Sequence, residues 1–125
     1  YIGMNEMTKD VTINSATVWH PQVYQRFVEE RWFGSEQEKV DPALFIAGTG
    51  FAGETGEVME LLKKYIRDGY IDTIALEKEL GDALYYLTKI ASLFNLTLEG
   101  IMQTNYKKLI DRDARGVTRG SGNDR

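Results

Sequence analysis

The stretch Gly53-Glu54-Thr55-Gly56-Glu57-Val58-Met59-Glu60-Leu61-Leu62-Lys63-Lys64, followed later by Glu79-Leu80-Gly81-Asp82, decides the fold of this chain. Each segment has two acidic residues three positions apart. On a helix such residues share one face, with Cβ atoms roughly 5–6 Å apart. Two such helices packed as a hairpin would bring four carboxylates together, and carboxylate oxygens are ligands that suit Mg²⁺ and Mn²⁺. The predicted metal ligands are Glu54, Glu57, Glu79 and Asp82.

Acidic pairs at this spacing also arise by chance. With 19 acidic residues in 125, random placement would give roughly three pairs at i and i+3. The chain has four such pairs, namely Glu38/Asp41, Glu54/Glu57, Glu57/Glu60 and Glu79/Asp82. The number of acidic pairs is therefore no evidence for a metal site. The four predicted ligands stand out because they border the apolar stripe of their helices, where an acid is costly unless it is paired, hydrogen-bonded or metal-bound.

Length and composition fit one globular domain with a real core, since 42% of the residues are hydrophobic. We expect neither a membrane span nor a secretory signal, because no apolar run approaches 18 residues and no charged-then-apolar leader is visible. The absence of cysteine excludes disulfides and zinc–thiolate sites and is compatible with a cytoplasmic location. The net charge of −4 argues against broad nucleic-acid binding, although basic residues gather from Lys107 onward.

Hydrophobic periodicity and capping residues predict an all-α fold. Asp41-Pro42 is expected to begin a long helix and Gly69 to end it. Asp72 or Thr73 is expected to cap the next helix, and Thr97 the last. The predicted helices cover about residues 21–33, 42–68, 73–95 and 98–112. Together they predict a four- to five-helix bundle in which an antiparallel helical hairpin carries the acidic metal site.

The predicted domain plan has three parts. They are an N-terminal arm over residues 1–17, an all-α domain over residues 18–112 and a polar, Gly/Arg-rich tail over residues 113–125. A short extended segment is expected at Val11–Asn14 within the arm. In the first helix, Tyr24 and Phe27 are interpreted as core residues, because aromatic side chains dominate cores. Trp32 and Phe33 lie at the end of that helix. Of its aromatic residues, they are the best placed to lie outside the core and to stack on a nucleobase.

A dinucleotide-binding unit is the main competing interpretation. Residues 43–53 fit a strand followed by a glycine-rich loop, and Asp72 lies near the position of a ribose-binding acid. A doubly wound sheet needs further buried strands rich in Val and Ile, and residues 74–94 have a helical period instead. We therefore favour the all-α fold over this one. The glycines at positions 48, 50, 53 and 56 are interpreted as points of close approach on a long helix, where each costs up to about 1 kcal/mol relative to alanine.

A third group of polar residues lies on the last predicted helix. Asn105, Lys108 and Arg112 share one face, at a spacing that lets their side chains donate hydrogen bonds to one phosphate chain. A stripe of Lys and Arg is, however, more often a solvent-exposed helix face. The pattern of both acidic pairs followed by Asn105-x-x-Lys108 and Arg112 resembles the MazG-like all-α nucleoside triphosphate pyrophosphohydrolases over about residues 20–112. The stretch from Arg115-Gly116-Val117 to Gly120-Ser121-Gly122 resembles the tails of small phage-type members.

The resemblance implies a function and a set of site residues. Enzymes of this family are helical dimers or dimers of dimers that split (d)NTPs into (d)NMP and pyrophosphate with Mg²⁺. Carried over, the two acidic pairs would bind the metal, and Glu57 would orient or deprotonate the attacking water. Asn105, Lys108 and Arg112 would hold the phosphates. Tyr86 resembles a substrate-pocket tyrosine of the related dCTP pyrophosphatases, with core packing an equal alternative. The expected partners are a nucleotide substrate and a second copy, with no nucleic acid and no membrane.

Three other functions are compatible with parts of this pattern. Phosphoribosyl-ATP pyrophosphatase is a chemically close relative that differs in its substrate. A non-enzymatic helical dimerisation or adaptor module would carry the same acids on a solvated face. A di-iron carboxylate bundle needs Glu-x-x-His pairs, and the only histidine, His20, precedes a proline far from the acids. This last alternative is nearly excluded.

Overall fold

The computed structural model describes residues 13–32 and 40–120, and this part of the chain is helical without any strand. The helices are α2 (Pro21–Arg31), α3 (Val40–Asp68), α4 (Thr73–Leu93) and α5 (Leu98–Ala114). The predicted all-α fold is confirmed. The glycine-rich stretch of residues 48–53 lies inside α3, so it forms no strand-to-helix turn. No helix in the described ranges is both long enough and apolar enough to span a membrane.

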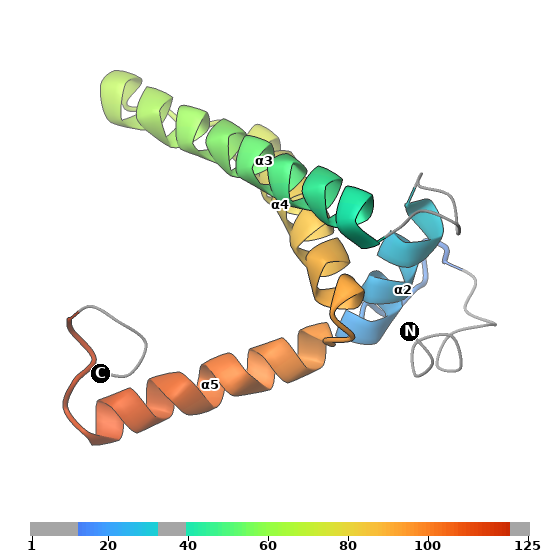
Figure 1. Cartoon of the computed structure of the whole chain (residues 1–125). Helices are drawn as coiled ribbons and strands as arrows, with labels where there is room; N and C mark the ends of the chain where they lie inside the picture. Colours follow the sequence, from blue (N-terminus) through green and yellow to red (C-terminus); the bar gives the residue numbers. More distant parts are fainter. Residues whose placement is uncertain (1–12, 33–39, 121–125) are drawn as a thin grey trace.

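Helices α3 and α4 form an antiparallel hairpin (Figure 1). The end of α3 is set by Gly69, which has a positive φ of 73° and donates its N–H to the carbonyl of Tyr65 at 2.8 Å. The start of α4 is capped by Asp72, whose carboxylate accepts the N–H groups of Ile74 and Ala75, both at 3.0 Å. Both boundaries were predicted correctly from local sequence. The turn between the two helices is therefore short, with Gly69 ending α3 and Asp72 capping α4.

The start of α3 differs from its prediction. The helix begins at Val40, so Asp41-Pro42 lies in its first turn and Asp41 is not the N-cap residue. Helix ends shift easily by one or two residues, because the first turn of a helix has unsatisfied N–H groups that several local arrangements can serve. The site is unaffected, since it lies farther along α3. The other expectations for Val11, Thr12 and Phe33 lie outside the described residues, and Ile13 and Asn14 form no strand.

Helix α2 joins the hairpin to α5 through a buried glutamine. The amide nitrogen of Gln25 donates to Ser92 Oγ at 3.0 Å and to the carbonyl of Leu96 at 2.8 Å. Its amide oxygen accepts the N–H of Leu98 at 3.0 Å, at the first residue of α5. Gln25 is 1% exposed, so a single buried side chain bonds to the Ser92 side chain of α4, to the turn that follows it and to the first residue of α5.

The direction of α5 follows from this turn. Asn95 adopts a left-handed conformation (φ 55°), and the Thr97 hydroxyl accepts the N–H of Gly100 at 3.0 Å as the N-cap. From there α5 projects away from the α3/α4 hairpin (Figure 1). It ends at Ala114, two residues beyond the predicted end, and no regular element follows it up to residue 120.

The buried core of the described chain is small. Its buried apolar residues are Val28, Ala43, Ala47, Ala83, Ala91 and Leu98. Many larger apolar side chains are exposed, among them Met102 (59%) and Tyr106 (65%) on α5. Tyr24 and Phe27 are half-buried, with ring centroids 6.2 Å apart. A single chain therefore leaves much of the apolar surface of its helices open.

Candidate metal centre

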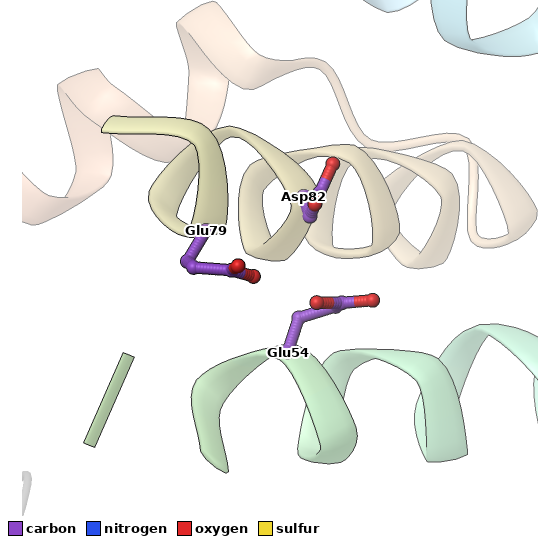
Figure 2. Close-up of side chains that lie close together, drawn as sticks. All are labelled: Glu54, Glu79 and Asp82. Carbon is purple, nitrogen blue, oxygen red and sulfur yellow. The ribbon is translucent and has the colours of Figure 1, made fainter. Parts of the chain in front are cut away.

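Three acidic side chains meet between α3 and α4. One carboxylate oxygen from each of Glu54, Glu79 and Asp82 lies within 4.8 Å of the others. Figure 2 shows Glu54 reaching from α3 towards α4, with Glu79 turned towards it from α4. Glu54 and Glu79 are half-buried, whereas Asp82 is exposed. The i, i+3 spacing on α4 places Glu79 and Asp82 on one face, and the antiparallel register of the hairpin brings Glu54 to them.

Partial burial and crowding by the other acids raise the pKa of Glu54. The causes are its partial burial first, then the negative charges of Asp82, Glu79 and Glu57, and finally a hydrogen bond with Glu79. Like charges held this close repel one another, and a divalent cation would remove the repulsion. Carboxylate oxygens are also the ligands that Mg²⁺ and Mn²⁺ prefer. The chemistry of the three residues therefore fits a bound divalent cation.

Glu57 lies outside this group of three. It is exposed on α3, about one turn beyond Glu54, and close enough for its charge to raise the pKa of Glu54. Its predicted roles as metal ligand and as base stay predictions. The next acid, Glu60, is engaged elsewhere, because its carboxylate lies 2.6 Å from Lys63 Nζ, and this hydrogen bond lowers the pKa of Glu60. Glu60 therefore has a basic partner among the described residues, unlike the three acids that meet between α3 and α4.

Aromatic residues flank the acids on the α2 side. Tyr86 follows Asp82 by one turn of α4 and packs against Gly50 of α3. Tyr24 of α2 has a raised pKa, caused by burial first and then by the charges of Tyr85 and Asp82. Core packing of Tyr86 is therefore observed, and its contact with a substrate stays a prediction. Sequence reasoning did not connect Tyr24 with the acids, since only the packing of α2 on α4 makes this pair close.

A buried ion pair lies farther along the same face of α4. Lys89 is 6% exposed, and its ammonium lies 3.2 Å from a carboxylate oxygen of Glu29 on α2. The same ammonium is 4.8 Å from the ring centroid of Trp32, within the range of a cation–π interaction. Trp32 also stacks on Tyr85, with centroids 6.3 Å apart and 21° between the planes. Trp32 therefore packs against Tyr85 and Lys89 of α4. This packing was not predicted from the sequence.

The predicted phosphate-binding residues lie apart from the acids within one chain. Asn105 is exposed, Lys108 is half-buried and Arg112 is buried. All three belong to α5, which points away from the hairpin (Figure 1). Their assignment as substrate contacts stays a prediction. Two basic residues farther along α3 are paired with acids outside the group of three, Lys63 with Glu60 and Arg67 with Asp68.

Fold and site together define an all-α protein whose helical hairpin gathers three carboxylates with a spacing that fits a metal ion. The model of the MazG nucleotide pyrophosphohydrolase domain family matches residues 48–117, and the chain belongs to this family. It is also similar to "Gene 37 protein" of Mycobacterium phage L5, with 38% identity over 81 residues that cover 61% of this chain and 71% of that protein. No solved structure matches the chain.

These comparisons confirm the resemblance found in the sequence. The matched region contains both acidic pairs and most of α3, all of α4 and all of α5. Family membership supports a nucleotide pyrophosphohydrolase activity that depends on a metal ion, in agreement with the acids on the hairpin. The similarity to a phage protein agrees with a small, phage-type member.

Proposed function

We propose that this protein hydrolyses (d)NTPs to (d)NMP and pyrophosphate with Mg²⁺ as cofactor, and that it sanitises or controls a nucleotide pool. The observation that carries the proposal is the meeting of Glu54, Glu79 and Asp82 within 4.8 Å, inside the region that matches the family. A triphosphate is a polyanion, and an acidic site alone would repel it. The site therefore suits this substrate only when cations occupy it.

The chain's own residues have distinct roles in this proposal. Glu54, Glu79 and Asp82, joined by Glu57, hold Mg²⁺ or Mn²⁺. When bound, such ions supply positive charge to the phosphates and lower the pKa of a coordinated water. Water attacks the α-phosphorus, the bond from that phosphorus to the bridging oxygen breaks, and pyrophosphate leaves with the electron pair. Glu57 is exposed and lies about one turn of α3 beyond Glu54, and it accepts the proton of the attacking water.

The phosphate contacts proposed for α5 require a second chain. Asn105, Lys108 and Arg112 lie on a helix that leaves the hairpin (Figure 1), so those that serve this site come from a neighbouring copy. The exposed apolar side chains of α5, such as Met102 and Tyr106, favour a homodimer or dimer of dimers that covers them. Light scattering of the wild type and of Tyr106→Glu tests this arrangement, and a monomeric wild type would contradict it.

Product analysis tests the proposed reaction. The eight canonical NTPs and dNTPs are incubated with the protein, with and without Mg²⁺, and pyrophosphate is resolved from orthophosphate and NMP from NDP. We expect Mg²⁺-dependent NMP and pyrophosphate from the wild type, none from Glu54→Gln, and wild-type rates from Glu77→Gln. Glu77 is an exposed acid on α4 outside the cluster, so it is a matched control.

Other outcomes would point to other functions. Orthophosphate with NDP would contradict the proposal and require a different phosphatase mechanism. Activity on phosphoribosyl-ATP but on none of the eight nucleotides would favour the related pyrophosphatase. No turnover and no change of melting temperature with Mg²⁺ would favour a dimerisation or adaptor module, because a ligand that binds only the folded state must stabilise it. The cytoplasmic location expected from the cysteine-free sequence stays a prediction.

A further inference from the structure

Gly50 of α3 is in very close contact with Tyr86 of α4. A Cβ atom at position 50 would lie 2.5 Å from Tyr86 Cε1, 2.6 Å from Cζ and 2.7 Å from Cδ1. These separations are far below the 3.5–4.0 Å at which carbon atoms attract each other. The other glycines in the middle of α3 are different, since Gly48, Gly53 and Gly56 have nothing within 4 Å of such an atom. Of these four glycines, Gly50 alone is explained by a contact with α4.

The ring of Tyr86 is also held from other sides. Its centroid lies 5.5 Å from that of Tyr85 and 6.5 Å from that of Trp32, with interplanar angles of 88° in both pairs. Both are edge-to-face arrangements, a favourable geometry for aromatic pairs. Trp32 is in turn stacked on Tyr85. A side chain added at Gly50 would therefore push α3 away from α4, because Tyr85 and Trp32 pack against the Tyr86 ring and prevent it from moving aside.

This contact lies next to the acidic cluster. Glu54 follows Gly50 by four residues on α3, and Asp82 precedes Tyr86 by four residues on α4. The helices are antiparallel, so the contact between Gly50 and Tyr86 and the approach of Glu54 to Asp82 are neighbouring levels of one hairpin, about 5–6 Å apart along it. The spacing of the helices at the first level thus determines the spacing of the carboxylates at the second.

We propose that Gly50 and Tyr86 are positioning residues for the metal site. Their contact sets the separation of α3 and α4 at which Glu54 can share a cation with Glu79 and Asp82. This inference rests on the proposed function, because it assumes that the cluster binds a divalent cation. Mg²⁺ requires nearly ideal octahedral geometry with ligands at about 2.0–2.1 Å, so a small displacement of α3 removes Glu54 from the coordination shell.

The test measures Mn²⁺ affinity of the full chain by electron paramagnetic resonance of the free ion, without nucleotide. We expect Gly50→Ala to weaken binding at least tenfold while far-UV circular dichroism shows a folded helical protein. Gly48→Ala is the matched control, because it adds the same methyl group to the same helix where nothing lies within 4 Å. Its Mn²⁺ affinity should stay within twofold of the wild type.

A double variant separates positioning from general destabilisation. Tyr86→Ala alone lets the helices close up and should also weaken Mn²⁺ binding. In Gly50→Ala/Tyr86→Ala the new methyl group meets no ring, so the double variant should bind Mn²⁺ more tightly than Gly50→Ala. If Gly50→Ala alone does not fold, a folded double variant demonstrates the clash, and its Mn²⁺ affinity is compared with that of the wild type. Wild-type affinity in a double variant that lacks the contact would overturn the proposal.

The possible results distinguish this inference from the proposed function. A wild type that binds Mn²⁺, with Gly50→Ala folded and binding it equally well, would overturn the positioning role and leave the proposed function intact. Equal weakening by Gly50→Ala in the presence and absence of the Tyr86 ring would overturn it as well. A wild type that binds neither Mn²⁺ nor Mg²⁺ would contradict the proposed metal site, and the inference with it.

Discussion

Glu54 of α3 and Asp82 of α4 approach each other across the hairpin, with carboxylate oxygens within 4.8 Å. They belong to different helices, and the loop that joins these helices is defined by Gly69 and Asp72 at its ends. The register of the two helices brings the carboxylates together. The described cluster offers neither of them a basic partner, so their negative charges repel each other. A cation is the simplest means of stabilising the pair.

Neutralising one of these acids should separate activity from folding. Asp82→Asn and Glu54→Gln are expected to lower turnover on the order of 100-fold or more, because bound metal supplies several kcal/mol of transition-state stabilisation. Their metal-free melting temperatures should be equal to or above that of the wild type, because one repelling charge is gone. Nucleotide turnover and calorimetry measure both. Near-wild-type activity of Asp82→Asn, or of Glu57→Gln, would show that the residue is not a metal ligand.

The acidic cluster should make metal-free stability depend on pH. The folded-state pKa of Glu54 is raised, through burial and the charges of Asp82, Glu79 and Glu57. The folded protein therefore holds this proton more tightly than the unfolded chain. The stability that Glu54 contributes is present below about pH 4.5, its usual pKa, and is lost as pH rises through the raised value.

This pH dependence can be measured in melting curves. Metal-free wild type should lose stability between pH 4.5 and neutrality relative to Glu54→Gln, which has no proton to lose at this position. Excess Mg²⁺ should restore the wild type at neutral pH and have little effect on Glu54→Gln. Parallel pH profiles of the two proteins without metal would show that the carboxylates do not repel each other as inferred.

The cap of α4 should contribute to stability without affecting the metal site. Asp72 accepts two backbone N–H groups at 3.0 Å, and Asp72→Ala is expected to cost about 1 kcal/mol of unfolding free energy, the usual loss for an N-cap. Urea unfolding measures this, with the exposed Glu77→Ala as control. Mn²⁺ affinity of the folded protein should not change, because Asp72 lies seven residues before Glu79. A weaker Mn²⁺ affinity would mean that the hairpin end also orders the acids.

Local rules were sufficient for most of the secondary structure and part of the site. Gly69, Asp72 and Thr97 were predicted as helix boundaries because each satisfies backbone groups within a few residues of itself. The acids at Glu79 and Asp82 could likewise be placed on one face from their spacing alone. The packing of the two acidic helices as a hairpin was also predicted, and Glu54 lies beside these acids as that packing requires.

Contacts between distant segments could not be predicted from the sequence. The pairing of Lys89 with Glu29 joins residues 60 positions apart, and no spacing rule relates them. Of the four glycines proposed as points of close approach, only Gly50 has, among the described residues, an atom of another helix within 4 Å of the place a Cβ would take. The direction of α5 was also beyond local rules, because it depends on how Gln25 of α2 packs against the α4–α5 turn.

Gln25 therefore offers the last prediction. Gln25→Leu keeps a similar volume but leaves the carbonyl of Leu96 and the N–H of Leu98 without the hydrogen bonds they now make. A buried polar group without a partner costs about 1–3 kcal/mol, so we expect a loss of about 2–4 kcal/mol in urea unfolding. Gln103→Leu, exposed on α5, is the control and should change stability little. In hydrogen exchange, the first turn of α5 should lose protection in Gln25→Leu while the centre of α4 keeps it. Equal loss throughout would mean that Gln25 stabilises the whole chain without specifically fixing the start of α5.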